Sequence, residues 1–301
     1  MAGVWRAGAL IVIAGAAAGW FLTAPETLDT GQFEGLTGDA ARGEAVFTAA
    51  GCASCHTSPD AAPGVSPPVL SGGQRFASAF GTFVAPNISP DPVHGLGGWS
   101  DADMLSAVMR GVAPGGTHLY PAFPYDAYGK ASAQDMLDLV AYWRTLPPVA
   151  TPSQPHEVGF PFNIRRAVGG WKLLFSSDDW AVQGDLTDQQ ARGRYLVEAL
   201  AHCGECHTPR NVLGGLQPGQ WLAGAPNPSG EGNIPNITPG ALTWSEAQIA
   251  EYLKSGFTPE FDTAGGEMAE VIRNTSRLSD DDRLAIAAYL KVVAPIAPAA
   301  E

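Results

Sequence analysis

The first two dozen residues have a different hydrophobic pattern from the rest of the chain. Residues 7–22 form an almost unbroken apolar run with Arg6 before it. This order is typical of an export signal whose positive end stays in the cytoplasm. Val4 to Leu22 is also long enough to span a bilayer at about 1.5 Å per residue. We therefore predict an N-terminal signal-anchor helix over residues 1–25. Pro25 follows the small residues Thr23 and Ala24 and disfavours cleavage by signal peptidase at that point. The alternative is a signal peptide that is removed.

Beyond this run, short amphipathic stretches alternate with turn-rich ones, and each half of the chain shows three helix signals. The first helix is expected over residues 39–50 in one half and 188–200 in the other. Serine with Asp or Gln three residues later has the spacing of a helix N-cap and its partner. The pairs are Ser100 with Asp103, Ser245 with Gln248, Ser132 with Asp135, and Ser279 with Asp282. A stripe at i, i+3, i+4 and i+7 follows Asp135 and is interpreted as core, Met136 included.

The two halves also repeat short sequences in the same order. The repeated segments are Pro86-Asn87-Ile88 with Pro235-Asn236-Ile237, Trp99-Ser100 with Trp244-Ser245, and Ala141-Tyr142 with Ala288-Tyr289. We therefore predict an all-α chain of two tandem domains over residues 36–147 and 185–295. The apolar segment 148–184 is expected to pack between them.

Composition and charge narrow the classes of function. The 301 residues include 36 Gly and 25 Pro, which predicts many loops, and the formal net charge is −13. An acidic chain argues against nucleic-acid binding, because phosphate recognition needs a basic face.

The pattern Cys-x-x-Cys-His occurs twice, as Cys52, Cys55 and His56 and again as Cys203, Cys206 and His207. It is the attachment signature of c-type haem: the two thiols bind the macrocycle and the histidine ligates the iron. These motifs use all four cysteines of the chain. A zinc site would need four ligands at tetrahedral spacing. A thioredoxin-like redox pair needs no histidine after it. We expect two covalently attached haem c groups.

The sixth ligand of each iron decides the chemistry, because a haem with two protein ligands carries electrons and one with an open position binds substrate. Met268 is the only methionine after the second motif and is expected in a loop beside that iron. An alignment of Gly111 with Gly256 without gaps places Phe123, which cannot ligate iron, at the position of Met268.

The first iron therefore needs another ligand or is open. His118 lies five residues before Phe123 and is the leading candidate, which would give two histidine ligands. Further candidates are Met104, Met109, Lys130 and His94.

Four stretches resemble blocks in the cytochrome c subunits of bacterial membrane-bound dehydrogenases for alcohols, aldehydes, gluconate and related sugars. These stretches are residues 119–125, 160–165, 170–175 and 202–211. The resemblance implies all-α cytochrome c folds, membrane attachment, and electron relay from a partner's cofactor to the respiratory chain. Many members of that group carry three haems and have methionine at the position of Phe123.

We therefore expect an electron carrier in the inner membrane, with its haem domains in the periplasm and a dehydrogenase or other redox protein as partner. The chain has no nucleotide or flavin motif and no hydrolase nucleophile elbow. The alternative is a dihaem enzyme of the peroxidase or thiosulfate-oxidising type that uses an open first haem.

Overall fold

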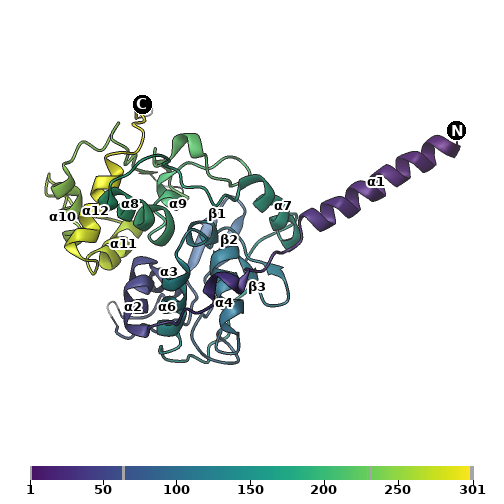
Figure 1. Cartoon of the computed structure of the whole chain (residues 1–301), viewed down its shortest axis with the longest axis horizontal. Coiled ribbons are helices and arrows are strands. Elements are labelled where there is room, and N and C mark those ends of the chain that lie inside the picture. The colour runs from purple at the N-terminus through teal and green to yellow at the C-terminus, as the bar shows by residue number, and fades with distance from the viewer. Residues whose placement is uncertain (1, 63–64, 229, 231, 299–301) are drawn as a thin grey trace.

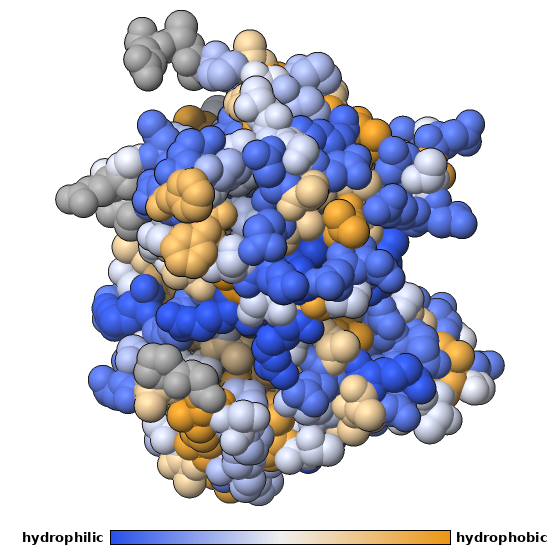
Figure 2. Space-filling view, turned by 90° about the vertical axis from the view of Figure 1, so that its left-hand side faces the viewer, coloured by the Kyte–Doolittle hydropathy of each residue, from blue (hydrophilic) through white to orange (hydrophobic). Residues whose placement is uncertain are grey.

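The computed structural model describes residues 2–62, 65–228, 230 and 232–298. A body of two mainly helical halves carries one helix, α1 (Ala2–Leu22), that projects away from it (Figure 1). The side of the body opposite α1 is largely hydrophilic, with apolar residues scattered among charged ones (Figure 2). Within the described part of the chain, no helix is both long and apolar enough to cross a membrane. The transmembrane span predicted for residues 1–25 is not supported by that finding.

The first half contains two long helices that cross and several short elements between them. Its helices are η1 (Thr30–Phe33), α2 (Ala40–Ala49), α3 (Cys52–His56), α4 (Asp101–Arg110), α5 (Tyr125–Tyr128) and α6 (Ala133–Trp143). Its strands are β1 (Arg75–Ser78), β2 (Gly81–Val84), β3 (Val112–Ala113) and β4 (Thr117–His118).

The second half repeats this order with small changes. Its helices are α8 (Asp188–Arg194), the π-helix η2 (Tyr195–Leu200), α9 (Gly204–His207), η3 (Pro218–Gln220), α10 (Glu246–Ser255), α11 (Glu267–Thr275) and α12 (Asp280–Leu290). Its strands are β5 (Ala225–Pro226) and β6 (Asn233–Ile234). Each strand pair of the described chain is a two-stranded antiparallel ribbon within a loop region. The fold is thus mostly helical but not strictly all-α.

The predicted helix starts are present. Ser100 and Ser245 each accept a hydrogen bond from the backbone three residues on, and the side chain of that third residue bonds back. Ser132 and Ser279 cap α6 and α12 in the same way with one bond each. These caps satisfy amide groups that have no partner inside the helix.

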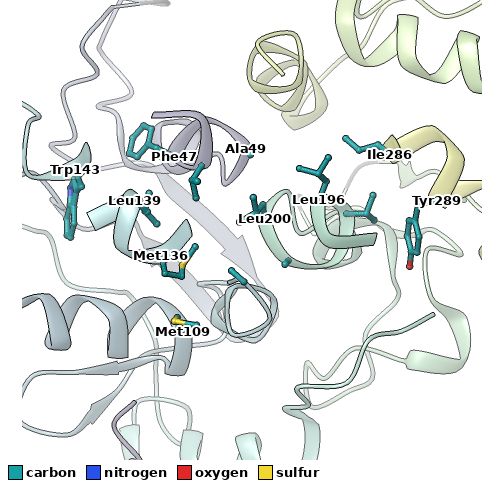
Figure 3. Packing of buried hydrophobic residues seen from close by; sticks show 14 of the residues in the cluster. Phe47, Ala49, Met109, Met136, Leu139, Trp143, Leu196, Leu200, Ile286 and Tyr289 are labelled. Atoms are coloured by element: carbon teal, nitrogen blue, oxygen red, sulfur yellow. The ribbon is translucent and has the colours of Figure 1, made fainter. Parts of the chain in front are cut away.

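Each half is built on a close crossing of its first and last long helices, α2 with α6 and α8 with α12. A Cβ atom on Gly43 would lie 1.9 Å from Asp138 O, and one on Gly193 would lie 1.9 Å from Ala285 O. Only glycine permits backbones to approach so closely. Buried apolar side chains, Met136 among them, surround both crossings (Figure 3).

The segment between the halves contains helix α7 (Arg165–Phe175). Trp171 Nε1 donates to Leu213 O of the second half at 3.0 Å, and Lys172 Nζ donates to Gly111 O of the first at 3.0 Å. Phe175 lies against Gly215. The segment therefore packs on both halves.

Candidate haem sites

The two Cys-x-x-Cys-His motifs fold into equivalent short helical turns. Cys52 and Cys55 lie three residues apart on α3, and Cys203 and Cys206 have the same spacing at α9. Residues three apart on a helical turn point to one side. All four thiols are free of disulfide bonds. Each turn thus presents two thiols together, with a histidine directly after them.

Both histidines have the same hydrogen-bond partner. His56 Nδ1 lies 2.9 Å from Pro86 O, and His207 Nδ1 lies 2.8 Å from Pro235 O. Because a carbonyl oxygen can only accept, Nδ1 carries the proton and donates. Nε2 therefore keeps its lone pair, which is the tautomer an iron ligand requires.

The loops that supply these prolines are each held by an asparagine, which is buried in the first half and half-buried in the second. Asn87 Nδ2 donates to Val149 O at 2.7 Å and to Thr151 O at 2.8 Å. Asn236 Nδ2 donates to Ile296 O at 2.9 Å. In each half, the chain that leaves the last helix is thereby tied to the loop that orients the histidine.

The motif side chains favour their neutral forms. Burial raises the pKa of both Cys52 and Cys203 to about 12. Burial also lowers the pKa of His56 and His207, although the proline carbonyls act in the opposite direction. Apolar surroundings with paired thiols and a neutral imidazole fit a covalently attached haem.

Met268 is the second residue of α11, which Gly266 precedes with a φ of 55°. It is half-buried and packs against the core of the second half. Burial raises the pKa of the Cys206 thiol, and the nearby Glu267 carboxylate adds to that effect. The start of α11 therefore lies beside the second motif. The residue was expected in a loop, and the structure places it in a helix.

The gap-free alignment of the halves has a structural counterpart. β3 pairs with β4 at His118, and an isolated bridge joins Phe257 to Thr263 at the same place in the second half. Phe123 follows His118 by the same number of residues as Met268 follows Thr263. The Phe123 ring packs 5.7 Å from the ring of Tyr128, measured between centroids. A phenylalanine thus stands where the second half has its candidate ligand.

His118 is 3% exposed, and its Nε2 donates to Thr23 O at 3.1 Å. Burial lowers its pKa, and the cations of Lys172 and Arg166 lower it further, although the Thr23 carbonyl acts in the opposite direction. Nδ1 is buried and has no partner in the described part of the structure. These contacts come from the start of the body and from α7, not from the first motif. Iron ligation by His118 stays a prediction.

The other candidates for the first iron have ordinary structural contacts. Met104 and Met109 lie on α4 within the hydrophobic core, where Figure 3 shows the sulfur of Met109 on the same side of the cluster as Met136. Lys130 Nζ donates to Asp126 O at 3.0 Å. The His94 amide donates to Asp91 at 2.7 Å.

The two motifs approach each other across the boundary between the halves. Asn274 on α11 donates from Nδ2 to Ser54 Oγ, inside the first motif, at 2.8 Å. Burial raises the pKa of Cys55 to about 11, and the next largest contribution comes from the Cys206 thiol. The first motif therefore lies at the boundary with α11 of the second half.

A family model described as cytochrome c matches the chain twice, over residues 40–147 and 190–294. Both matches contain one motif with its histidine and the proline that orients it. The chain belongs to the cytochrome c family. The cytochrome therefore carries two covalently attached haem c groups.

The cytochrome is similar to several characterised proteins. It is 58% identical over 288 residues to a dihaem cytochrome c-type protein of Cereibacter sphaeroides, with 96% of this chain and 97% of that protein covered. It is 40% identical to the fructose dehydrogenase cytochrome subunit of Gluconobacter japonicus, with 84% of this chain and 52% of that subunit covered. It is 35% identical to the gluconate 2-dehydrogenase cytochrome c subunit of Pantoea cypripedii, with 88% and 63% covered. The chain thus spans somewhat over half the length of these two dehydrogenase subunits.

Sequence reasoning found the thiols and histidines of the cytochrome but missed the groups that orient them. The repeated segments that begin with Pro86 and Pro235 were the signal for the carbonyl partners. The bond from Asn274 to Ser54 joins residues far apart in the chain, so no local sequence pattern predicts it.

Proposed function

We propose that this dihaem cytochrome relays electrons from a partner dehydrogenase to an acceptor of the respiratory chain. When bound, haem c supplies one-electron chemistry, and the protein sets its position and potential. The observation that carries the proposal is the contact between the halves at the motifs. Asn274 of the second half bonds to Ser54 inside the first motif at 2.8 Å, and Tyr128 of the first half packs against His202 directly before the second. Two haems attached at motifs on this boundary would exchange electrons inside one molecule. The dehydrogenase subunits among its relatives support a donor of that class.

The contact between the halves is stabilised directly beside the motifs. Tyr128 is held within the first half by a bond from its Oη to Ala50 O at 2.8 Å. Its ring packs edge-on against His202, which precedes the second motif, with 5.5 Å between centroids. These contacts, together with the bond from Asn274 to Ser54, would fix the separation of the two haems.

For the sixth positions, we propose Met268 at the second iron and retain His118 as the leading candidate at the first. Methionine ligation raises the potential of a haem relative to histidine ligation. Electrons would then run from the first half to the second. An EPR spectrum of the oxidised protein tests this scheme. Two low-spin signals would support it, and a high-spin signal from one haem would contradict it.

A dihaem enzyme is the second candidate function. Phe123 at the position of Met268, with His118 Nε2 engaged by Thr23 O, favours an open first haem. Such a protein would bind carbon monoxide or cyanide at one haem without reduction of the other. Turnover with hydrogen peroxide or thiosulfate would then replace the carrier proposal.

We further propose that the haem-bearing body works outside the cytoplasmic membrane, because the N-terminal sequence has the features of an export signal. Cell fractionation with detection of covalently bound haem tests this location. Haem-loaded protein in the cytoplasmic fraction would contradict it.

A further inference from the structure

Four stretches of the chain bring large apolar side chains to the surface near α7. They are residues 21–22, 160–164, 173–174 and 212–213, which we call the α7 patch. Phe160 is 81% exposed, Leu174 is 70% exposed and Val212 is 94% exposed. Apolar side chains exposed singly are ordinary, but a contiguous group of them marks an interaction site.

Side-chain contacts show that these stretches adjoin one another. The Arg166 guanidinium lies 4.2 Å from the ring centroid of Trp20, at the end of α1. Trp171 Nε1 bonds to Leu213 O at 3.0 Å. Phe80 stacks edge-on with Phe162 at 5.0 Å between centroids. Phe80 also lies against Gly214, so that it joins the 160–164 and 212–213 stretches.

Helix α7 has an apolar outer side. Its inner side is buried at Val168 and Gly169, and a Cβ on Gly169 would lie 2.3 Å from Thr23 O. Leu173 and Leu174 point outward with 60% and 70% of their surface exposed. A surface helix of a water-soluble body normally turns polar residues outward. We therefore expect an apolar surface of another body to cover the outer side of α7.

Two of the three cations of α7 have no acidic partner. Among the described residues, Arg165 and Arg166 form no ion pair and donate to carbonyl oxygens. Lys172 turns inward to Gly111 O, where burial lowers its pKa to about 8 and Asp126 acts in the opposite direction. The two arginines thus place positive charge beside the apolar side chains in a chain whose formal net charge is −13. The hydrophilic face opposite α1 contrasts with it (Figure 2).

We propose that the α7 patch rests on a lipid bilayer that contains anionic headgroups. Apolar side chains flanked by arginine and tryptophan are a composition that binds the interface of such a bilayer. The patch is also continuous with the end of α1, whose side chains at Trp5, Leu10 and Ile13 are exposed as well. A bilayer covers both surfaces at once, which a protein partner docked on the patch alone does not. The inference requires no membrane-spanning helix and is independent of the identity of the electron donor.

The test uses the full-length, haem-loaded protein with vesicles of phosphatidylcholine alone or mixed with phosphatidylglycerol. Hydrogen exchange and vesicle flotation are measured for the unaltered protein and for the double variant Leu173→Ser, Leu174→Ser. Phe261→Ser is the matched control, because Phe261 is 89% exposed and lies in the second half away from α7. Unchanged haem spectra establish that each variant is folded.

We expect mixed vesicles to slow exchange in peptides covering 160–164 and 211–214 about tenfold or more. The double variant should lose this protection and partition about tenfold less onto mixed vesicles, from the loss of two leucines at an interface. The Phe261→Ser control should behave as the unaltered protein does. Binding should also be several-fold weaker to phosphatidylcholine alone.

Two results would overturn the inference. In the first, α1 peptides are protected by vesicles while residues 160–164 and 211–214 exchange as they do in free protein. In the second, the patch becomes protected without vesicles as the protein concentration rises, which would identify a second copy of the chain as its occupant.

Discussion

The two halves of the molecule share one side of the haem site and differ on the other. The bonds from histidine to proline carbonyl agree within 0.1 Å, at 2.9 Å and 2.8 Å. On the opposite side, Met268 of the second half has Phe123 as its counterpart. The groups that hold a haem thus stay constant between the copies, and the group that would tune it changes. Such a division lets one fold provide two different potentials.

The helix crossings show a second difference of the same kind. Asp138 of α6 is 1% exposed and accepts from Asp39 N and Arg42 Nε at 2.7 Å each. The matching position on α12 is Ala285, beside which Arg192 pairs with Asp282 at 2.7 Å. The first half therefore stabilises its crossing with a buried carboxylate and the second with a pair nearer the surface.

The largest effect is expected where the halves are alike. Gly43→Ala and Gly193→Ala would each force a Cβ into a carbonyl oxygen 1.9 Å away and separate the crossing helices. We expect each change to cost about 3 kcal/mol or more of unfolding free energy. Chemical denaturation followed by circular dichroism measures this cost. Gly159→Ala is the control, since no atom lies within 4 Å of its added Cβ.

Equal losses from the two glycine variants would confirm that the crossings are equivalent. A loss below about 1 kcal/mol from either one would show that its helices can separate without penalty, and the comparison of the halves would fail there.

If Met268 and Phe123 are each replaced by the residue of the other half, the two haem potentials should shift in opposite directions. Met268→Phe should lower the potential of the second haem by on the order of 0.1 V, which is about 2.3 kcal/mol for one electron. Phe123→Met should raise the potential of the first if its sulfur reaches the iron. A spectroscopic redox titration of both variants measures these shifts. Met136→Leu, a change within the core, is the control and should leave both potentials in place.

Removal of the two asparagines should reveal a smaller difference between the halves, in unfolding free energy. Asn87 is 1% exposed and donates to two carbonyl oxygens, whereas Asn236 is half-buried and donates to one. A buried acceptor left without its donor costs about 1–3 kcal/mol. We expect Asn87→Ala to cost about 3 kcal/mol and Asn236→Ala about 1 kcal/mol in denaturant titrations. A larger loss from Asn236→Ala would reverse this ranking.

The helices with local start signals could be predicted from the sequence, and those without could not. The serines at 100, 132, 245 and 279 sit where the caps require them, because a cap depends on residues three apart. Helix α7 begins after Ile164 without a side-chain cap and contains two consecutive glycines. Helix α11 follows Gly266, also without a cap. Tertiary packing stabilises both helices, and no short-range pattern reports it.

The residues of the haem sites likewise divide into those that the sequence predicts and those that only the packing reveals. The thiols, the histidines and the exchange of Met268 for Phe123 are visible in the repeat. The environment of His118 is not, because its bond to Thr23 O joins residues 95 positions apart. The bond from Asn274 to Ser54 depends on how the halves pack, which neither motif encodes by itself.

The smallest expected effect is a pH dependence confined to the first half. Burial by itself would raise the pKa of Asp138, but bonds from Arg42, the Asp39 amide and Gln134 outweigh it and hold that pKa below its ordinary value. The stability that the carboxylate contributes is thus complete above its unfolded pKa near 4 and is lost as the pH falls through the folded value. We expect Asp138→Asn to cost about 1–2 kcal/mol at pH 7. The difference in unfolding free energy between this variant and the unaltered protein should shrink steadily below about pH 4.

Asp282→Asn, which breaks the more exposed pair with Arg192, should cost under about 1 kcal/mol in the same denaturation series. A constant gap between Asp138→Asn and the unaltered protein from pH 7 down to pH 3 would mean that packing, not the charge of Asp138, distinguishes the two crossings.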